Sequence, residues 1–504
     1  NFEELITGNY IYVDKTPHIY QLINNGKYYF LSRPRRFGKS LLLDTIKCLF
    51  EGKEHLFNKL FIHQHWNWNQ SYPVIKISFA SFKKTNTYNL EDFIYKRLKE
   101  IANLHNIHLN ETEYYKTFRE LVIKLSKKNK VVVLIDEYDK PILDNIENTN
   151  IAKEYRETLK GFYQVIKDMD EYLQFVFLTG VSKFSKVSIF SGLNNLNDIS
   201  IDTQFSSILG YTQSEVESYF GNMLEGVNMK KLKWWYNGFQ WSGESVYNPF
   251  DILLFIDKGK KFQNYWFQTG TPTFLIKILL EKKFFIPELE NITATELLLS
   301  SFDIDNINPL ALLFQTGYLT IKQTIEYENL TQFILSYPNM EVKMALNDFI
   351  LQYFTNLLDK DATKINILNS LIHANIEKII QSFSSIFAGI PYQWYINNHL
   401  HEYEGFFASI FYSVFQALGL DVIPEDITNK GRIDLTVKIN NNIFIFEFKT
   451  NPSPNNTIHS PLQQIKIKKY HEKYLQHNKN IFLIGIEFSK KDKNIINYEY
   501  EKIT

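Results

Sequence analysis

The chain has 504 residues, more than one hydrophobic core usually holds, so several folding units are expected. Hydrophobic residues make up 44% of the chain and aromatic residues 16%, which excludes a wholly disordered protein. Lys plus Arg and Asp plus Glu both number 55, so a nucleic-acid partner would have to be held by local basic patches and not by net charge.

A single cysteine, Cys48, excludes an internal disulfide and a cysteine-rich zinc site. No segment approaches the roughly 20 consecutive apolar residues that span a bilayer, and the first residues carry no signal-peptide pattern. The sequence therefore predicts a soluble, cytoplasmic protein without a membrane partner, and it leaves the oligomeric state open.

The first part of the chain alternates apolar strand-like runs with helical patterns, which is typical of a parallel α/β sheet. These runs lack the polar alternation of a strand with one wet face, so helices are expected to cover both faces of the sheet. The first run is followed by a predicted helix, Ser40–Glu51. The clearest strands are Tyr28–Ser32, Val74–Ala80, Val131–Asp136 and Phe175–Thr179.

A candidate phosphate-binding loop joins the first strand to this helix. A strand, such a loop and a helix form the context in which main-chain N–H groups and a positive helix N-terminus hold phosphates. Lys39 would reach the β- and γ-phosphates of ATP, and Ser40 would hold Mg²⁺. Gly38 would let the backbone approach the phosphates closely. The ATP-binding candidates in the loop are Arg35, Arg36, Phe37, Gly38, Lys39 and Ser40.

The first position of the usual P-loop pattern, normally glycine, is Arg33. Arg33 has to make the turn with an ordinary side chain, so the loop is expected to be less permissive than usual. The alternative interpretation is a basic turn before a helix that binds no phosphate.

Acidic residues end the third predicted strand, where Val131–Ile135 leads into Asp136 and Glu137. This is the Walker B arrangement, in which Asp136 would complete the Mg²⁺ shell and Glu137 would polarise the attacking water. A cap to the next helix is the alternative role for Asp136. Thr179, at the end of the fourth strand, would either sense the γ-phosphate or cap the strand. Together these motifs predict an ATP-binding P-loop domain over residues 1–205.

The pattern changes after this domain. Residues 206–289 consist of short helical stretches and aromatic-rich turns, which predict a small helical or winged lid module. Residues 290–395 are mainly helical, with a hairpin expected around Gly317–Phe333, and would form a helical connector. Aromatic residues near Trp234 and Trp266 would either pack the small module or stack nucleic-acid bases.

A second chemical signal lies in a predicted α/β domain over residues 396–504. Two apolar strands, Ile433–Ile439 and Ile443–Lys449, flank the turn-forming stretch Asn440-Asn441-Asn442. A helix and a further strand, Ile481–Phe488, follow. The most loop-like part of this domain, Thr450–Ser460, separates the hairpin from that helix.

The length of the turn decides which residues of the hairpin face each other. A two-residue turn at Asn440-Asn441 would place Asp434 directly opposite Glu447, whereas a three-residue turn would shift the register by one. Glu447 and Lys449 share one face of their strand through its period of two, while the neighbouring phenylalanines point into the core.

Two carboxylates and an ammonium on one face form a poor core but a suitable metal site. Asp434, Glu447 and a backbone carbonyl, that of Phe448, would hold Mg²⁺ or Mn²⁺, because both are hard ions that prefer oxygen ligands. The metal would activate water and neutralise a phosphodiester, while Lys449 would position the hydroxide and stabilise the charged transition state. The alternative is a charged stripe that only faces solvent.

Motifs spread over nearly the whole chain resemble the bacterial AAA-ATPase-like family. The resemblance implies that Arg33 is compatible with a working ATP site, because members of that family place arginine where the P-loop usually has its first glycine. The matching segments are Tyr12-Val13-Asp14-Lys15-Thr16, Ser32–Ser40, Thr179–Ser185, Trp235–Phe239, Tyr247-Asn248-Pro249, Tyr265-Trp266 and Tyr337-Pro338-Asn339.

The C-terminal segment resembles the PD-(D/E)XK nuclease domain that is often fused to this family. The resemblance implies that Glu404 on the first helix is a further metal ligand, with Glu402 as the neighbouring alternative, and that Gln464 on the later helix faces the catalytic site. The matching segments are Glu404-Gly405-Phe406-Phe407, Gly431-Arg432-Ile433-Asp434, Glu447-Phe448-Lys449 and Leu462-Gln463-Gln464-Ile465. Nearby lysines would track phosphates or stay solvated; they are Lys449, Lys466, Lys468, Lys469 and Lys473.

We therefore expect an α/β protein: a P-loop NTPase parallel sheet, a small helical or winged module, a helical linker and a C-terminal PD-(D/E)XK domain. The expected function is ATP hydrolysis together with metal-dependent cleavage of phosphodiester bonds, in DNA by analogy with the superfamily. One alternative is a nucleotide-dependent switch or interaction protein whose nuclease fold binds nucleic acid without cutting. Another is an ATPase remodeller with weak incidental cleavage.

Overall fold

The chain forms two compact units. One comprises Asn1–Trp266 and Thr293–Asn339, and the other comprises Phe267–Ile292 and Met340–Thr504. The predicted connector, residues 290–395, is thus divided between the two units. The computed structural model describes residues 1–503 apart from 86–87, 184–189, 191–194, 267–272, 283, 300–303, 305, 355–359, 392–403, 452–459 and 478. The predicted loop Thr450–Ser460 therefore lies almost wholly outside the described residues.

A parallel sheet forms the centre of the first unit. Its strands are β1 (Tyr28–Ser32), β2 (Val74–Ser78), β3 (Val131–Asp136), β4 (Leu173–Gly180) and β5 (Asn197–Asp198). They lie in the order β2-β3-β4-β1-β5, which confirms the predicted parallel sheet and places β4 between the P-loop strand and the acid-bearing strand. Every residue of β1 and β3 is buried, because both faces of the sheet are covered.

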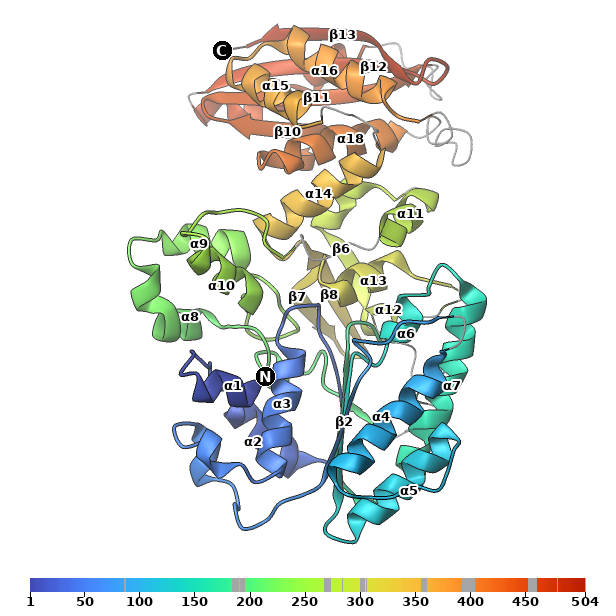
Figure 1. The fold of residues 1–504 in the computed structure, drawn as a ribbon. Helices are drawn as coiled ribbons and strands as arrows, with labels where there is room; N and C mark the ends of the chain where they lie inside the picture. Colours follow the sequence, from blue (N-terminus) through green and yellow to red (C-terminus); the bar gives the residue numbers. More distant parts are fainter. Residues whose placement is uncertain are drawn as a thin grey trace. The chain divides into compact units, whose positions relative to one another are not determined.

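Helices cover this sheet on both faces (Figure 1). Helix α3 (Lys39–Phe50), which follows the P-loop, lies on one face, and the helices on the other are α4 (Leu90–Leu104), α5 (Tyr114–Ser126) and α7 (Thr149–Asp168). An asparagine N-cap begins both α4 and α7, where its side chain accepts a hydrogen bond from a main-chain N–H of the first turn. The shorter helices are α1 (Phe2–Thr7), α2 (Thr16–Asn25) and α6 (Lys140–Leu143).

A small helical module follows the sheet; of the predicted module 206–289, residues 206–266 belong to this unit and residues 267–289 to the other. Its core is strongly aromatic and includes Tyr236, Tyr247 and Phe255. Trp266 is buried, so its role is packing, whereas Trp234 is 55% exposed. The helices of the module are α8 (Gln213–Phe220), α9 (Met229–Tyr236) and α10 (Pro249–Asp257).

The motif Tyr12–Thr16 attaches this module to the N-terminal segment. The buried Lys15 ammonium pairs with Glu215 at 2.7 Å and donates to the carbonyl of Ser207 at 2.9 Å. Glu215 is also the third residue of the capping box that begins α8, where Thr212 is the N-cap. One carboxylate therefore fixes both the start of α8 and its attachment to the N-terminal segment.

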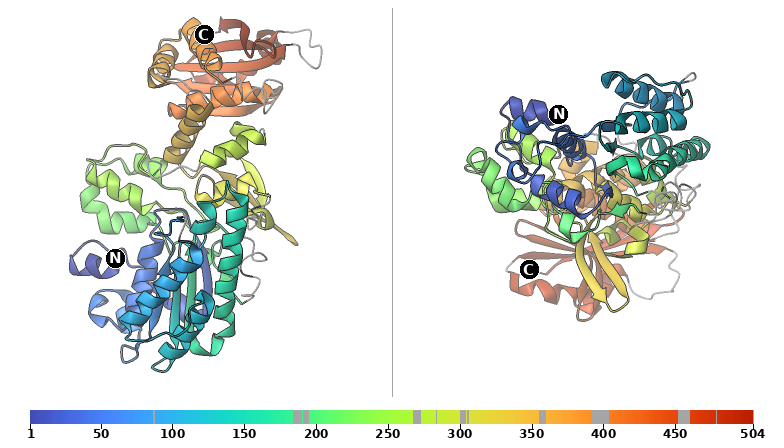
Figure 2. Two further views of the ribbon diagram at one scale, coloured as in Figure 1. Left: turned by 45° about the vertical axis from the view of Figure 1, so that its right-hand side comes forward. Right: turned by 90° about the horizontal axis from the view of Figure 1, so that it is seen from below.

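The segment Thr293–Asn339 belongs to the first unit and contains the predicted hairpin. Its sheet has the order β6-β8-β7, and both views in Figure 2 show β7 and β8 as a long two-stranded ribbon. Among the described residues, two short helices lie between β6 and this hairpin. The elements are β6 (Ile292–Thr295), α12 (Glu296–Leu299), α13 (Pro309–Thr316), β7 (Thr320–Tyr327) and β8 (Leu330–Ser336).

The second unit is built on a mixed sheet. Its strands are β9 (Asp421–Thr428), β10 (Gly431–Ile439), β11 (Asn442–Asn451), β12 (Asn480–Ser489) and β13 (Asn494–Lys502), in the order β13-β12-β11-β10-β9. Strands β11 and β12 pair in parallel and the other neighbours pair antiparallel. The three predicted strands are confirmed as β10, β11 and β12. The edge strands β9 and β13 were not predicted.

Helices pack on both faces of this second sheet. On one face, stacked phenylalanines join the helices to the strands: Phe383 lies 3.6 Å from Phe411, and Phe407 lies 4.2 Å from Phe488 of β12, measured between ring centroids. On the other face, Ile465 of α19 joins a buried cluster with isoleucines of β11. The helices are α11 (Thr273–Glu281), α14 (Met340–Phe354), α15 (Lys360–Ile372), α16 (Ile376–Ala388), α18 (Glu404–Ala417) and α19 (Pro461–Lys468), followed by the 3-10 turns η9 (Tyr470–His477).

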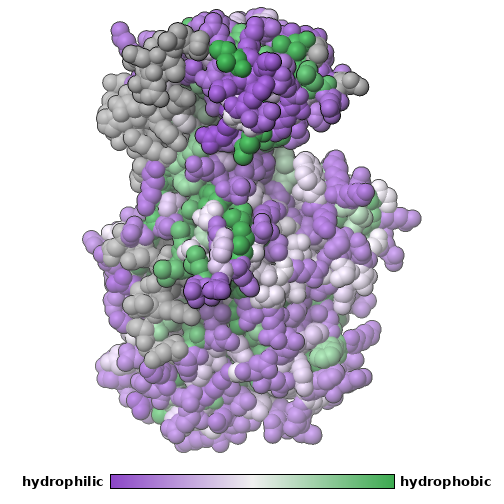
Figure 3. All heavy atoms as spheres, turned by 180° about the vertical axis from the view of Figure 1, so that it is seen from behind, coloured by the Kyte–Doolittle hydropathy of each residue, from purple (hydrophilic) through white to green (hydrophobic). Residues whose placement is uncertain are grey.

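The face of the molecule drawn in Figure 3 is predominantly hydrophilic, with hydrophobic residues scattered over it. This agrees with sheets that bury their apolar side chains under helices on both sides. Within the part of the chain that the structure describes, no helix is both long and apolar enough to cross a membrane.

Candidate active sites

The P-loop connects β1 to α3 and turns through the left-handed region at two positions. Gly38 has a φ of 95° and Arg36 a φ of 68°. A Cβ at Gly38 would meet its nearest protein atom, on Leu209, at 3.8 Å, so the positive φ is what favours glycine within the protein itself. The free N–H groups of the first turn of α3 follow directly, which is the arrangement that binds anions.

Lys39 begins α3, and its side chain folds back into the loop. The Nζ atom donates to the carbonyl oxygens of Arg33 and Pro34, both at 2.8 Å. Burial lowers the pKa of Lys39 to about 8, while the nearby Asp136 carboxylate opposes that shift. The ammonium is thus held within the loop, as a phosphate-binding lysine requires.

Arg33 has a wholly buried side chain and a negative φ, so its position does not demand glycine. The guanidinium donates to the carbonyl oxygens of Ser32, Ser200 and Phe205 at 2.9, 2.7 and 3.2 Å. It also lies 4.0 Å from the ring centroid of Trp241. Burial lowers the pKa of Arg33 to about 9. This arginine ties the start of the P-loop to the segment that follows β5.

Asp136 ends β3 beside the first turn of α3. Its carboxylate accepts hydrogen bonds from Ser40 Oγ at 2.5 Å and from Thr179 Oγ1 at 2.9 Å, and only 2% of the residue is exposed. The two side chains predicted to share Mg²⁺ therefore lie in direct contact. Thr179 is wholly buried, and its hydroxyl joins β4 to β3.

Glu137 follows Asp136 in a left-handed conformation, with a φ of 50°. Such a conformation is unfavourable for a residue with a side chain, and it is found mainly where surrounding structure enforces it. Burial and then the neighbouring Asp136 carboxylate raise the pKa of Glu137. A carboxylate with a raised pKa is a stronger base, which suits the role predicted for Glu137.

The other P-loop candidates differ in what their side chains contact. Phe37 is buried and packs edge-on against Trp241, with 5.4 Å between ring centroids, so only its main chain is suited to meet a phosphate. Arg35 and Arg36 are exposed. The Arg36 guanidinium lies 5.0 Å from the ring centroid of Phe250 in the small module.

The hairpin of the second unit has the predicted register. The turn is Asn440-Asn441, and the strands pair as far as Leu435 opposite Phe446. Asp434 and Glu447 occupy the next position along this register. A positive φ of 48° at Asn440 is typical of such a tight two-residue turn.

Asp434 and Glu447 each make a hydrogen bond within the second unit. The Asp434 carboxylate accepts the main-chain N–H of Phe448 at 2.7 Å. Glu447 is only 3% exposed and accepts a hydrogen bond from Gln464 Nε2. Lys449 is half-buried and follows on the same face of β11. Because Glu447 is buried, it is not part of a charged stripe that only faces solvent.

Gly485 explains how Gln464 reaches Glu447. Gly485 of β12 is the ladder neighbour of Glu447, and a Cβ there would lie 2.4 Å from the main-chain nitrogen of Leu462. Only glycine therefore allows the first turn of α19 to lie so close to the sheet. The close approach brings the Gln464 amide within reach of the buried carboxylate.

Tyr470 is a site residue that the sequence did not reveal. It begins η9, is 3% exposed, and its hydroxyl would lie 2.9 Å from a Cβ on Gly431, which has a φ of 150°. Burial, followed by the carboxylates of Glu447 and Asp434, raises the pKa of Tyr470. The phenol therefore lies near both acids. An aromatic residue shortly after the helix of Gln464 is the one signal that points to it.

The predicted metal site has three carboxylate ligands, Asp434 and Glu447 on the hairpin and Glu404 on α18. Glu404 is the first residue of α18, but its side chain lies outside the described part of the structure. Among the described residues, no group of three or more His, Cys, Asp or Glu side chains could hold a metal. Two carboxylates beside a main-chain carbonyl still fit Mg²⁺ or Mn²⁺, because Mg²⁺ is commonly bound by one or two carboxylates and keeps several waters.

Ion pairs occupy most of the lysines near this hairpin. Lys466 pairs with Glu501 at 2.6 Å, Lys469 with Glu472 at 3.7 Å, and Lys473 with Asp426. The predicted basic patch is therefore partly neutralised by acids from β9, β13 and η9. The pairs of Lys466 and Lys469 are exposed and therefore weak, so a polyanion would compete for these two lysines, whereas the partner of Lys473, Asp426, is buried.

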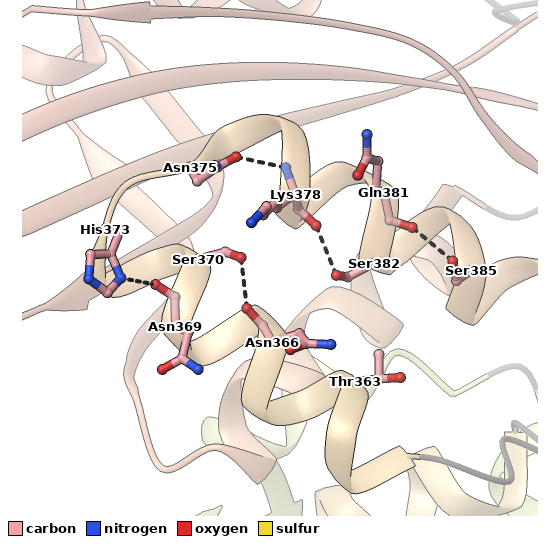
Figure 4. Close-up of a pocket in the computed structure, with 10 residues that line it drawn as sticks. All are labelled: Thr363, Asn366, Asn369, Ser370, His373, Asn375, Lys378, Gln381, Ser382 and Ser385. Atoms are coloured by element: carbon pink, nitrogen blue, oxygen red, sulfur yellow. Dashed lines mark hydrogen bonds between the residues drawn. The ribbon is translucent and has the colours of Figure 1, made fainter.

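A polar groove of about 560 Å³ lies between α15 and α16 (Figure 4). Its hydroxyls are largely engaged within their own helices, as when Ser382 donates to the carbonyl of Lys378. These helices are on the side of α18, whereas Glu447 faces α19, so the groove is separate from the hairpin site. Its lining residues are Thr363, Asn366, Asn369, Ser370, His373, Asn375, Lys378, Gln381, Ser382 and Ser385.

The fold and the two sites define a P-loop ATPase joined to a nuclease-type domain, and known proteins agree with this class. A family model described as a predicted AAA-ATPase matches residues 1–190, and one for the PD-(D/E)XK nuclease superfamily matches residues 402–498. An "uncharacterized protein in vnfD 5'region" of Azotobacter chroococcum mcd 1 is 45% identical over 501 residues, which cover 98% of this chain and 96% of that protein. No solved structure matches the chain. The protein belongs to the bacterial AAA-ATPase-like family with a C-terminal PD-(D/E)XK nuclease domain.

Arg33→Gly restores the usual P-loop sequence but is expected to weaken the protein. It removes three hydrogen bonds to buried carbonyls and the contact with Trp241, which should cost about 3 kcal/mol of stability and loosen ATP binding. Thermal unfolding and calorimetric ATP titration measure both effects. Arg35→Gly is the matched control for stability alone, because it removes an exposed arginine from the same loop. Equal stability of the two variants, with ATP bound as tightly as by the wild type, would contradict this role of Arg33.

Proposed function

We propose that the protein hydrolyses ATP at the P-loop and cleaves phosphodiester bonds of DNA at the β10–β11 hairpin, with Mg²⁺ or Mn²⁺ as the metal. The observation that carries the nuclease proposal is the buried Glu447 carboxylate beside Asp434, held by Gln464 on a face that also carries Lys449. A folded chain does not retain such a group in its interior without compensation. We place the reaction in the cytoplasm.

In the ATP site, each side chain has a role that follows from its position. Lys39 and the N–H groups of the loop would bind the β- and γ-phosphates, and Ser40 with Asp136 would hold Mg²⁺. Glu137, with its raised pKa, would take a proton from the attacking water. Thr179 supports this site by donating to Asp136 at 2.9 Å, which fixes the orientation of that carboxylate.

In the hairpin site, Asp434, Glu447 and the main chain near Phe448 would hold the metal. A bound Mg²⁺ or Mn²⁺ supplies positive charge that activates water and neutralises the phosphodiester. Gln464 orients the Glu447 carboxylate through its hydrogen bond. Lys449 would stabilise the negative charge that develops on the phosphate.

Asp434→Asn is expected to lower plasmid cleavage by about 100-fold or more, because a metal ligand matters more than the outer residues whose loss costs up to about 100-fold. The assay is degradation of plasmid DNA in Mg²⁺ or Mn²⁺, with and without ATP. Asp421→Asn is the matched control, since Asp421 is an exposed aspartate in the same sheet. If Asp434→Asn cuts as fast as Asp421→Asn, the nuclease proposal is wrong. Absence of cutting by the wild type, with DNA binding intact, would favour a switch that binds without cleaving.

Lys39→Ala is expected to lower ATP hydrolysis by about 100-fold or more, since it removes the cation that faces the transferred phosphate. Phosphate release measures this effect. Lys47→Ala, on the same helix but paired with Glu51 at 3.5 Å, is expected to keep wild-type hydrolysis. Hydrolysis by Lys39→Ala at the rate of the control would refute the ATPase proposal. An unaltered ATP response of plasmid cleavage in Lys39→Ala would refute coupling between the two sites.

A further inference from the structure

Three consecutive main-chain N–H groups after β4 are bound by side chains from other elements. Asp139, which follows β3, accepts the N–H groups of Val181 at 3.0 Å and Ser182 at 2.6 Å. The Oε1 atom of Gln315 accepts the N–H of Lys183 at 2.9 Å. The backbone that follows β4 is thus fixed from two sides.

This backbone leads directly out of the ATP site. Thr179, the residue that donates to Asp136, lies two positions before Val181, with Gly180 between them. A Cβ at Gly180 would lie 2.5 Å from the ring of Tyr138 and 2.7 Å from Asp139, so the loop is tightly packed against the end of β3. A shift of the loop would therefore move Thr179 against Asp136.

Gln315 comes from α13, far from β4 in the sequence. It is only 3% exposed, and its Nε2 atom donates to the carbonyl of Leu299 in α12 at 2.8 Å. Both ends of the amide are therefore engaged, which fixes its orientation. A buried amide with these two partners connects the loop after β4 to the segment Thr293–Asn339.

The end of the same helix also contacts the P-loop. Gly317, which caps α13 with a φ of 90°, is so close to Pro34 that a Cβ there would lie 2.7 Å from the proline ring. Tyr318 packs on Trp266, and Trp266 donates to the carbonyl of Arg35 at 3.2 Å. One short region therefore touches both loops that surround the predicted phosphate site.

We propose that Gln315 is a positioning residue for ATP hydrolysis. Through this residue, α13 completes the ATP site: it fixes the loop after β4 so that Thr179 keeps its hydrogen bond to Asp136. This rests on the proposed ATPase activity. Gln315 touches no phosphate; it acts through Lys183, the loop and Thr179. Without its acceptor, the Lys183 N–H is buried and unpaired, so the loop relaxes and the Thr179 contact loses its alignment. Any effector that moves α13 would change hydrolysis by the same route.

Gln315→Met tests this, because it keeps the size of the side chain but removes the acceptor. The expected result is a kcat for ATP lowered about tenfold or more, as for other residues that orient a catalytic group, with a KM changed less than about threefold. Gln315→Glu keeps an oxygen for the Lys183 N–H and, as the neutral acid that burial favours, also a donor for the Leu299 carbonyl, so it should recover most of the kcat. Thr316→Val is the matched control, since the Thr316 hydroxyl donates only within its own helix, to the carbonyl of Leu312 at 2.6 Å.

The kcat values and thermal unfolding of the variants together distinguish a positioning role of Gln315 from a folding defect. A kcat for Gln315→Met equal to that of Thr316→Val overturns the proposal, and so does a fall that Gln315→Glu does not recover. If Gln315→Met is not folded by thermal unfolding, Gln315→Asn, which keeps the amide but retracts it, gives the same comparison. Absence of hydrolysis by the wild type is a different result, because it overturns the ATPase function on which the role depends.

Discussion

Burial of a carboxylate on a strand of the sheet is the constraint on which both sites depend. Asp136 in the first unit and Glu447 in the second are 2% and 3% exposed. A carboxylate removed from water is stable only where hydrogen bonds or cations compensate for the lost hydration. Asp136 receives them from Ser40 and Thr179, and Glu447 from Gln464. The placement of α3, β4 and α19 follows from the need to bring these donors to the acids.

The unusual arginine of the P-loop is a second buried charge. A buried guanidinium is costly unless hydrogen bonds compensate for the lost water, and the two terminal nitrogens of Arg33 donate to carbonyls that lie far along the chain, at Ser200 and Phe205. Arg33, the first residue of the P-loop, therefore connects the loop to the rest of the first unit by hydrogen bonds. Gln315 fastens the neighbouring loop in a similar way. The segment after β5 and helix α13 therefore hold the loops of the ATP site in addition to the sheet.

Local patterns predicted the parts of the structure that depend on neighbours in the sequence. The turn at Asn440-Asn441 set the register of the hairpin. The buried strands were recognisable in the sequence as continuous apolar runs. The partners of Arg33, Gln315 and Tyr470 were not predictable, because each contact joins segments that are distant in sequence. The edge strands β9 and β13 escaped prediction since polar residues interrupt them, and β9 even contains Pro424, which edge positions tolerate.

The proposed nuclease activity requires that Asp434 and Glu447 hold a metal. Calorimetric titration of Mn²⁺ into the full chain without nucleotide tests it directly, because binding at the P-loop depends on phosphates. We expect the wild type and Lys39→Ala to bind Mn²⁺ alike, and Glu447→Gln to bind it about tenfold more weakly or worse. Indistinguishable titrations of the wild type and Glu447→Gln would contradict it.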